Sequence, residues 1–154
     1  RRKGMIELLK ALHFIKSNGV SILVAGTTDL GPLEINHRYI GYLSENELIK
    51  AYQLAHIFIC PSLEDSGPLM INQAIMCGTP VVAFNIGSAT DLVITGETGY
   101  LAKIKDPTDM ANGIDYVLSL TEIEYRNMSE NCRSLAMKLF STNIFKKKIE
   151  KLLN

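Results

Sequence analysis

One loop of this sequence combines a glycine, two neighbouring carboxylates and the start of a helix. Residues 61–68 read PSLEDSGP, and an apolar helical pattern continues from Leu69. The first turn of a helix presents backbone N–H groups without intrahelical acceptors, and the helix dipole adds partial positive charge there. Such a helix start suits an anion, especially a phosphate. The carboxylates of Glu64 and Asp65 could contact a polyol or a developing positive charge. The simpler alternative is that Asp65 or Ser66 only caps the helix.

The elements around this loop alternate between short apolar runs and helical patterns. Apolar spacing at i, i+3 and i+4 predicts the helices, and two S/T-x-x-E capping boxes mark the start of two of them. The predicted helices are 4–16, 44–54, 68–76, 106–118, 121–140 and 143–153, with a helical turn at 90–95, and the predicted strands are 20–25, 37–43, 57–60, 80–84 and 100–103. Strands that are continuous apolar runs, separated by helices, indicate an α/β fold with a parallel sheet covered on both faces.

Ligands of such open sheets bind at the carboxyl ends of the strands, beside helix N-termini. The loops in that position are 26–36, 61–68, 85–90 and 103–107. Loop 61–68 stands out, because it leaves a strand's carboxyl end and enters a helix through a glycine. We therefore expect the binding site there.

The overall composition excludes several classes of protein. A chain of 154 residues is the length of one domain, and its 16 basic and 16 acidic side chains cancel, which argues against a nucleic-acid-binding module. No apolar run is long enough to span a membrane. The three cysteines are widely spaced, which favours buried free thiols in a reducing cytosol. The opening residues RRKG precede a helix directly, with no initiating Met, signal peptide or leading strand, so we expect a piece of a longer polypeptide.

Residues 61–82, PSLEDSGPLMINQAIMCGTPVV, resemble the signature of the family 4 glycosyltransferases, which are retaining enzymes of GT-B fold. That signature has the form P-S-x-x-E-G-x-G-x-x-x-x-E-A-x-x-C-G-x-P-V-V. The similarity covers most of residues 1–118, through RKG at 2–4, YIGY at 39–42, IFICPS at 57–62, AFNIG at 83–87, DLV at 91–93 and GETGYLA at 96–102. It implies a Rossmann-like domain, the C-terminal, donor-binding half of a GT-B enzyme over residues 1–154, with the N-terminal acceptor half outside this sequence.

The signature's two glutamates are both replaced. Alignment on CGTP at 77–80 puts the first at Asp65 and the second at Gln73. Asp65 keeps the charge with one methylene less, whereas Gln73 keeps an acceptor oxygen without the charge. A second register, Glu64 with Asn72, breaks the CGTP alignment, and we prefer the first.

The resemblance also implies a role for each site residue. Asp65 would be the catalytic carboxylate, and Gln73 would accept a hydrogen bond from the ribose of the donor nucleotide. The remaining donor-binding residues are expected at Lys3 and Gly4 beside the phosphates, Ser66 and Gly67 lining their approach, Leu69 and Met70 offering backbone N–H groups to the diphosphate, and Ile40 and Tyr42 at the base edge. A solvated lysine at position 3 and an ordinary aromatic at position 42 are the simpler alternatives.

The implied reaction is transfer of a sugar from a nucleoside-diphosphate sugar to an acceptor hydroxyl, with retention. It needs no cofactor or metal, and we expect His13, His37 and His56 to be structural. The acceptor would be a sugar or lipid-linked sugar in polysaccharide or lipopolysaccharide assembly, in the cytoplasm or at the inner face of its membrane, with peripheral association of the full-length protein. A non-catalytic binding module and a sugar-nucleotide epimerase of GT-B fold are the alternatives. Epimerases lack the PSxxE…CGTPVV run.

Overall fold

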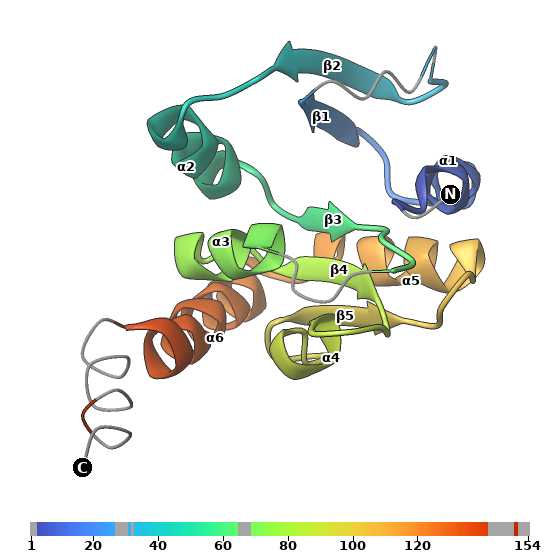
Figure 1. Ribbon diagram of the computed structural model, residues 1–154. Coiled ribbons are helices and arrows are strands. Elements are labelled where there is room, and N and C mark those ends of the chain that lie inside the picture. The colour runs from blue at the N-terminus through green and yellow to red at the C-terminus, as the bar shows by residue number, and fades with distance from the viewer. Residues whose placement is uncertain (1–2, 27–30, 32, 65–68, 142–149, 151–154) are drawn as a thin grey trace.

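The computed structural model describes residues 3–26, 31, 33–64, 69–141 and 150, and its elements follow the predicted order (Figure 1). The helices are α1 (Met5–Leu12), α2 (Glu45–Leu54), α3 (Leu69–Cys77), α4 (Ala89–Leu92), α5 (Pro107–Leu118) and α6 (Glu122–Phe140). The strands are β1 (Ser21–Ala25), β2 (Asn36–Gly41), β3 (Phe58–Cys60), β4 (Val81–Phe84) and β5 (Gly99–Ala102). Nearly every boundary lies within a few residues of its prediction.

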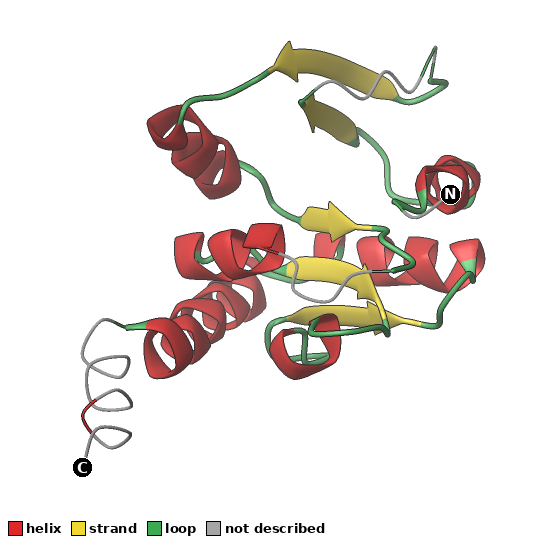
Figure 2. Ribbon diagram, in the orientation of Figure 1, coloured by secondary structure: helices red, strands yellow, loops and turns green. Residues whose placement is uncertain are grey.

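A three-stranded parallel sheet, in the order β3-β4-β5, forms the centre of the molecule (Figure 2). All four residues of β4, VVAF, are buried, as expected for a strand covered on both faces. Val81 and Ala83 join the core cluster of α3, α4 and α6, whereas Val82 and Phe84 join that of α1 and α5. The predicted fold class, a parallel sheet with helices on both faces, is confirmed.

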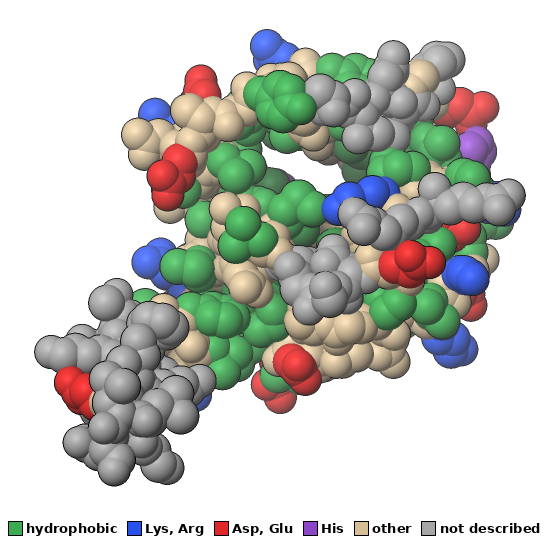
Figure 3. Space-filling model, viewed as in Figure 1, with side chains coloured by type: hydrophobic (Ala, Val, Ile, Leu, Met, Phe, Trp, Pro, Cys, Tyr) green, Lys and Arg blue, Asp and Glu red, His purple; other side chains and the backbone are tan. Residues whose placement is uncertain are grey.

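The sheet is interrupted in one place where a continuous sheet was predicted. β1 and β2 pair with each other, also in parallel, but form a separate two-stranded sheet. Most of their residues are exposed or only partly buried, and Val24 alone is classed as buried, at 9% exposure. Figure 3 shows the molecule hollowed between this pair and the rest, with hydrophobic side chains bordering the opening. No strand pairing joins β1 or β2 to β3 within the described residues, so the two sheets are separate.

Both predicted capping boxes are present. The backbone N–H of Ser44 donates to Glu47 Oε2 at 2.8 Å, and that of Thr121 donates to Glu124 Oε2 at the same distance. The hydroxyls of Ser44 and Thr121 donate to the same carboxylates, and these side-chain bonds, together with the backbone bonds, lower the pKa of both glutamates. Local sequence therefore sets where α2 and α6 begin.

The first helix ends at Leu12, four residues before the predicted end. The chain that follows is held by a carboxylate of α5, because the N–H groups of Lys16 and Ser17 each donate to Asp115 at 2.9 Å. The Ser17 hydroxyl also donates to Asp115, at 2.6 Å. A side chain nearly a hundred residues away thus supplies the acceptor, which local helical spacing could not reveal.

The predicted C-terminal helix, 143–153, lies outside the described residues except for Glu150. Among the helices that are described, none is long and apolar enough to cross a membrane.

Candidate functional site

The carboxyl ends of three parallel strands meet at one edge of the central sheet. Residue 61 follows β3, residue 85 follows β4 and residue 103 follows β5. Three of the four loops expected to hold a site therefore lie at the same edge. That edge is where open α/β sheets bind ligands.

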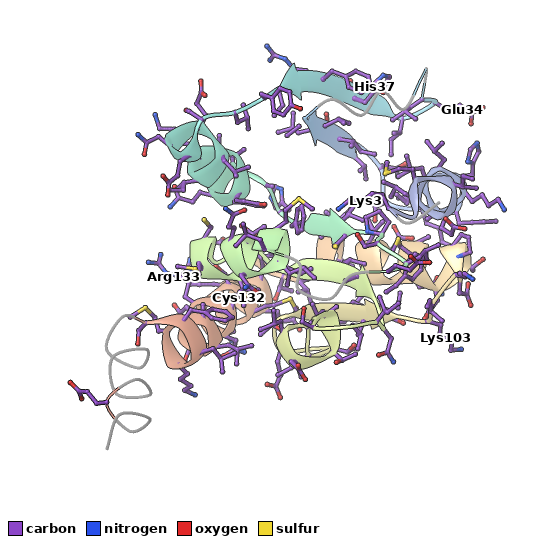
Figure 4. All side chains as sticks on the ribbon, in the orientation of Figure 1. Lys3, Glu34, His37, Lys103, Cys132 and Arg133 are labelled. Carbon is purple, nitrogen blue, oxygen red and sulfur yellow. The ribbon has the colours of Figure 1, made fainter. Side chains whose placement is uncertain are left out.

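The start of α1 meets the end of β3 at this edge. Gly4, the residue before α1, is buried with φ of 63°, and a β-carbon there would overlap the carbonyl oxygen of Pro61. Glycine alone meets both demands, for a left-handed backbone and for close approach. Lys3 is exposed, and Figure 4 shows it between α1 and the end of β3. The contact between Gly4 and Pro61 joins two segments of the family motif that are distant in sequence.

The start of α3 supplies the predicted N–H donors. Leu69 and Met70 form its first two positions and are 65% and 40% exposed, whereas Ile71 is fully buried in the core and anchors the helix. The first turn of an α-helix leaves backbone N–H groups without intrahelical acceptors. Gln73 is partly buried and lies one turn further along, on the same side as Leu69 and Met70. These three positions therefore fit a ligand bound at the start of α3.

Other predicted residues are not placed at this edge. Asp65, Ser66 and Gly67 lie outside the described residues, so the choice between the two registers stays a prediction. Ile40 and Tyr42 belong to the two-stranded sheet, Ile40 within β2 and Tyr42 just after it. Tyr42 is 81% exposed, so it is not a core aromatic.

A serine that sequence reasoning missed lies near the same edge. The hydroxyl of Ser88 is buried and has no hydrogen-bond partner among the described residues. Its neighbours Ile86 and Ala89 line a small cavity of about 10 Å³, and the rest of that lining consists of Cys60, Ser62, Ile71, Ala83 and Phe84. A buried hydroxyl without a partner is costly, so Ser88 is a candidate for contact with a ligand or water. Nothing in its sequence context distinguishes it from an ordinary loop serine.

The cysteines have structural surroundings. None of the three forms a disulfide; Cys60 and Cys132 are buried, and Cys77 is partly buried. Burial raises the pKa of Cys132 to about 12, and its thiol donates to the carbonyl of Thr98 at 3.4 Å. Burial also raises the pKa of Cys77, against the opposing effect of Arg133. The prediction of buried thiols without disulfides is confirmed for Cys60 and Cys132, whereas Cys77 is only partly buried. The raised pKa values of Cys77 and Cys132 argue against a nucleophilic role for these two.

The histidines have structural neighbours as well. His13, the residue after α1, has its Nδ1 2.8 Å from the carbonyl oxygen of Leu9 in that helix. The rings of His37 and His56 pack against Tyr39 and Tyr125, with centroids 5.5 and 5.7 Å apart.

The fold and the motif segments joined at its carboxyl edge define a Rossmann-like domain of the GT-B kind. The family model of the glycosyl transferases group 1 matches residues 1–135, and the chain belongs to that family.

Two curated relatives illustrate the family. An uncharacterized glycosyltransferase of Methanocaldococcus jannaschii is 25% identical over 77% of this chain and 33% of its own length. The O-antigen chain mannosyltransferase B of Escherichia coli is 35% identical over 64% of this chain and 25% of its own. This chain therefore spans a third or less of the length of these relatives.

Solved structures support the fold. A glycosyltransferase from Rickettsia africae superposes with a TM-score of 0.84 and 23% identity, covering 99% of this chain and 44% of that one. HepE of Anabaena, solved in complex with UDP, superposes with a TM-score of 0.82 and 24% identity, covering 99% and 45%.

Proposed function

We propose that residues 1–154 are the C-terminal, donor-binding domain of a retaining glycosyltransferase that binds a nucleoside-diphosphate sugar. The observation that carries this proposal is the packing of Gly4 against Pro61. It brings the basic start of α1 to the carboxyl edge of the sheet, where loop 61–68 leads into α3. A diphosphate at this edge would lie near the Lys3 ammonium and the N–H groups that begin α3.

The chemical contribution of this domain would be stabilisation of the leaving group. Negative charge grows on the diphosphate as the sugar departs, and the backbone amides of Leu69 and Met70 with Lys3 would balance it. Ser66 and Gly67 would line the phosphate approach, and Gln73 would accept a ribose hydroxyl. Asp65 would act on the sugar as the catalytic carboxylate.

These interactions involve hydrogen bonds and one fixed positive charge, so the proposed chemistry uses no metal or other cofactor. Ile40 and Tyr42, on the separate sheet, are the proposed contacts of the base.

The acceptor would bind to a domain outside this sequence. An acceptor sugar or lipid-linked sugar in polysaccharide or lipopolysaccharide assembly is proposed, supported by the similarity to the O-antigen mannosyltransferase. We place the full-length enzyme in the cytoplasm, with peripheral association at the inner membrane face. Since a transferase must hold both substrates together, residues 1–154 alone should transfer no sugar.

The test is isothermal calorimetry of the full-length protein with UDP and with GDP. Gln73→Glu should tighten binding of the preferred nucleotide by about fivefold. A hydrogen bond from a ribose hydroxyl to a charged acceptor is about 1 kcal/mol stronger than one to a neutral acceptor. Gln53→Glu, on the exposed side of α2, changes the net charge equally and should leave the affinity unchanged. Failure of both nucleotides to bind would refute the donor site. Weaker binding by Gln73→Glu alone would refute the ribose role.

A non-catalytic sugar-nucleotide module is the second candidate, because Gln73 lacks the charge of the family glutamate. The two candidates differ in turnover. Labelled donor consumed repeatedly by the full-length protein, with acceptors or water, supports the enzyme, whereas binding without turnover supports the module.

A further inference from the structure

A recess in the surface lies at the end of the central sheet opposite the candidate donor site. Gly96 borders it from the turn that leads into β5, at the amino end of that strand. Tyr116 borders it from the last turns of α5, a helix that begins at the carboxyl edge and runs back along the sheet. Its other wall is α6, which Figure 1 shows beside the tails of the β4 and β5 arrows. The recess is therefore separate from the loops at the carboxyl edge.

The recess has room for a small ligand and an apolar base. Its volume is about 250 Å³. Pockets that bind drug-sized molecules measure roughly 300–1,000 Å³, so this recess suits a ligand below that size. Met128, one of the residues that line it, is 3% exposed, and Leu120 beside it is partly buried. Buried apolar side chains beneath a polar rim are the usual construction of a small-molecule site.

The rim carries polar groups that are not engaged elsewhere. Asn127 and Asn131 lie one helical turn apart on α6, so their amides share a face of that helix. The Tyr116 hydroxyl lies near Gly96, because a β-carbon there would be 3.8 Å from it. Neither amide nor this hydroxyl makes a hydrogen bond within the part of the chain that the structure describes. Both capping-box bonds of Glu124 go to Oε2, which leaves its Oε1 to the recess.

The charge around the recess disfavours phosphates and metal ions. Among the described residues that line it, Glu124 alone is charged, so an anion would meet repulsion and no cation. A single carboxylate is too few for a metal site, and no group of three or more His, Cys, Asp or Glu side chains gathers among the described residues. Amides and phenol hydroxyls both donate and accept hydrogen bonds. These groups therefore match a neutral ligand that carries several hydroxyl groups.

We propose that this recess binds one neutral sugar residue of a glycan. The amides of Asn127 and Asn131 exchange hydrogen bonds with the sugar hydroxyls, and Glu124 Oε1 accepts a further one. The C–H face of the sugar ring packs on Met128. This binding goes beyond the proposed function, since it involves neither a nucleotide nor the transfer step. A glycan held here would raise the effective concentration of its other residues on the same protein.

Saturation-transfer difference NMR on the full-length protein tests the proposal. The probes are the methyl glycosides of glucose, galactose, mannose and N-acetylglucosamine, with UDP and GDP present to occupy the donor site. At least one glycoside should bind with a Kd on the order of 1 mM, as expected for a few exposed hydrogen bonds. Asn127→Ala combined with Asn131→Ala should weaken that binding at least about tenfold.

The matched control is Asn112→Ala, which removes an exposed amide of α5 that does not line the recess. It should leave the affinity for the glycoside unchanged. Asn127 and Asn131 are also exposed, and alanine favours a helix more than asparagine does, so the double variant should keep its fold. The affinity for UDP or GDP should be the same in every variant, which separates this test from that of the donor site. If no glycoside binds, or if binding survives the double substitution, the proposal is wrong.

Glu124→Gln separates a neutral sugar from an organic cation, which the carboxylate would also attract. Glutamine serves the capping box as glutamate does and keeps an acceptor oxygen. The affinity for the glycoside should therefore fall by about fivefold at most, and methylammonium should bind neither protein. Methylammonium that displaces the glycoside from the unsubstituted protein and no longer binds after Glu124→Gln would overturn the proposal, because it would assign the recess to a cation.

Discussion

The two sheets of this chain have the same strand direction within each pair but very different burial. In the central sheet β4 is buried on both faces by helices, and its neighbours β3 and β5 flank it on either side. In the β1–β2 pair most side chains are exposed or only partly buried, including Leu23, which is 51% exposed. Apolar strand sequences alone therefore do not produce a buried sheet. Burial requires helices on both faces and a partner strand on each edge.

The largest contrast is expected from replacing one glycine in each sheet with alanine. Gly99 in β5 has φ of 152°, and a β-carbon there would overlap the carbonyl of Val81 in β4. Gly99→Ala should therefore cost at least about 4 kcal/mol of unfolding free energy. Gly41 in β2 also has positive φ, but nothing lies near its β-carbon position, so Gly41→Ala should cost about 1 kcal/mol. Urea unfolding measures both, and equal costs would break the comparison.

A smaller contrast is expected from truncating one apolar side chain in each half. Ile71 is fully buried, and Ile71→Ala should cost roughly 3 kcal/mol, since it leaves a cavity in the core. Leu23 is half exposed, and Leu23→Ala should cost less than about 1 kcal/mol. The measurement is the shift of the urea midpoint at constant m-value. A costly Leu23→Ala would mean that β1 is covered in solution by something absent from this structure.

The smallest effect is expected at the bonds between α5 and the segment that leads to β1. Partial burial raises the pKa of Asp115, but hydrogen bonds from the Ser17 hydroxyl and from the N–H groups of Lys16 and Ser17 outweigh it, so the pKa is lowered below 3.8. Because the pKa of this carboxyl is lower in the folded state, the carboxylate stabilises the fold at any pH above its unfolded-state pKa. That stabilisation is lost as the pH falls through the folded-state pKa. Asp115→Asn should therefore lower the Tm near neutral pH, and the difference from the unsubstituted protein should shrink below pH 3.8.

The matched control is Asp91→Asn on α4, an exposed carboxylate, which should change the Tm little at any pH. A Tm difference for Asp115→Asn that stays constant down to the lowest pH would contradict the hydrogen-bonded carboxylate.

Local signals predicted most of the fold. The capping boxes at Ser44 and Thr121 set the starts of α2 and α6, and apolar runs located β3, β4 and β5. The early end of α1 was not predictable, because Asp115 holds Lys16 and Ser17 from a distant helix. The interruption beside β3 was not predictable either, since an apolar run gives no information about how many of its edges are paired.

The sequence predicted some residues of the candidate site and missed one. The family motif predicted Gly4, and the structure gives the reason: only glycine fits against Pro61. The motif also predicted Leu69, Met70 and Gln73, which share the start of α3. No pattern indicated Ser88, because an unsatisfied buried hydroxyl is a property of three-dimensional packing. Calorimetry with UDP and GDP tests whether these residues bind a donor.

The order of β3, β4 and β5 has a consequence for how the chain folds during its synthesis. Each strand of the central sheet pairs with the strand that precedes or follows it in sequence, so each new strand finds its partner already synthesised. Domains generally begin to fold during translation from the N-terminal side. As the nascent polypeptide leaves the ribosome, β3 would emerge first, β4 would find it already present, and β5 would then add to β4. The packing of α6, which buries its own residues Cys132 and Ala136, would complete the core last.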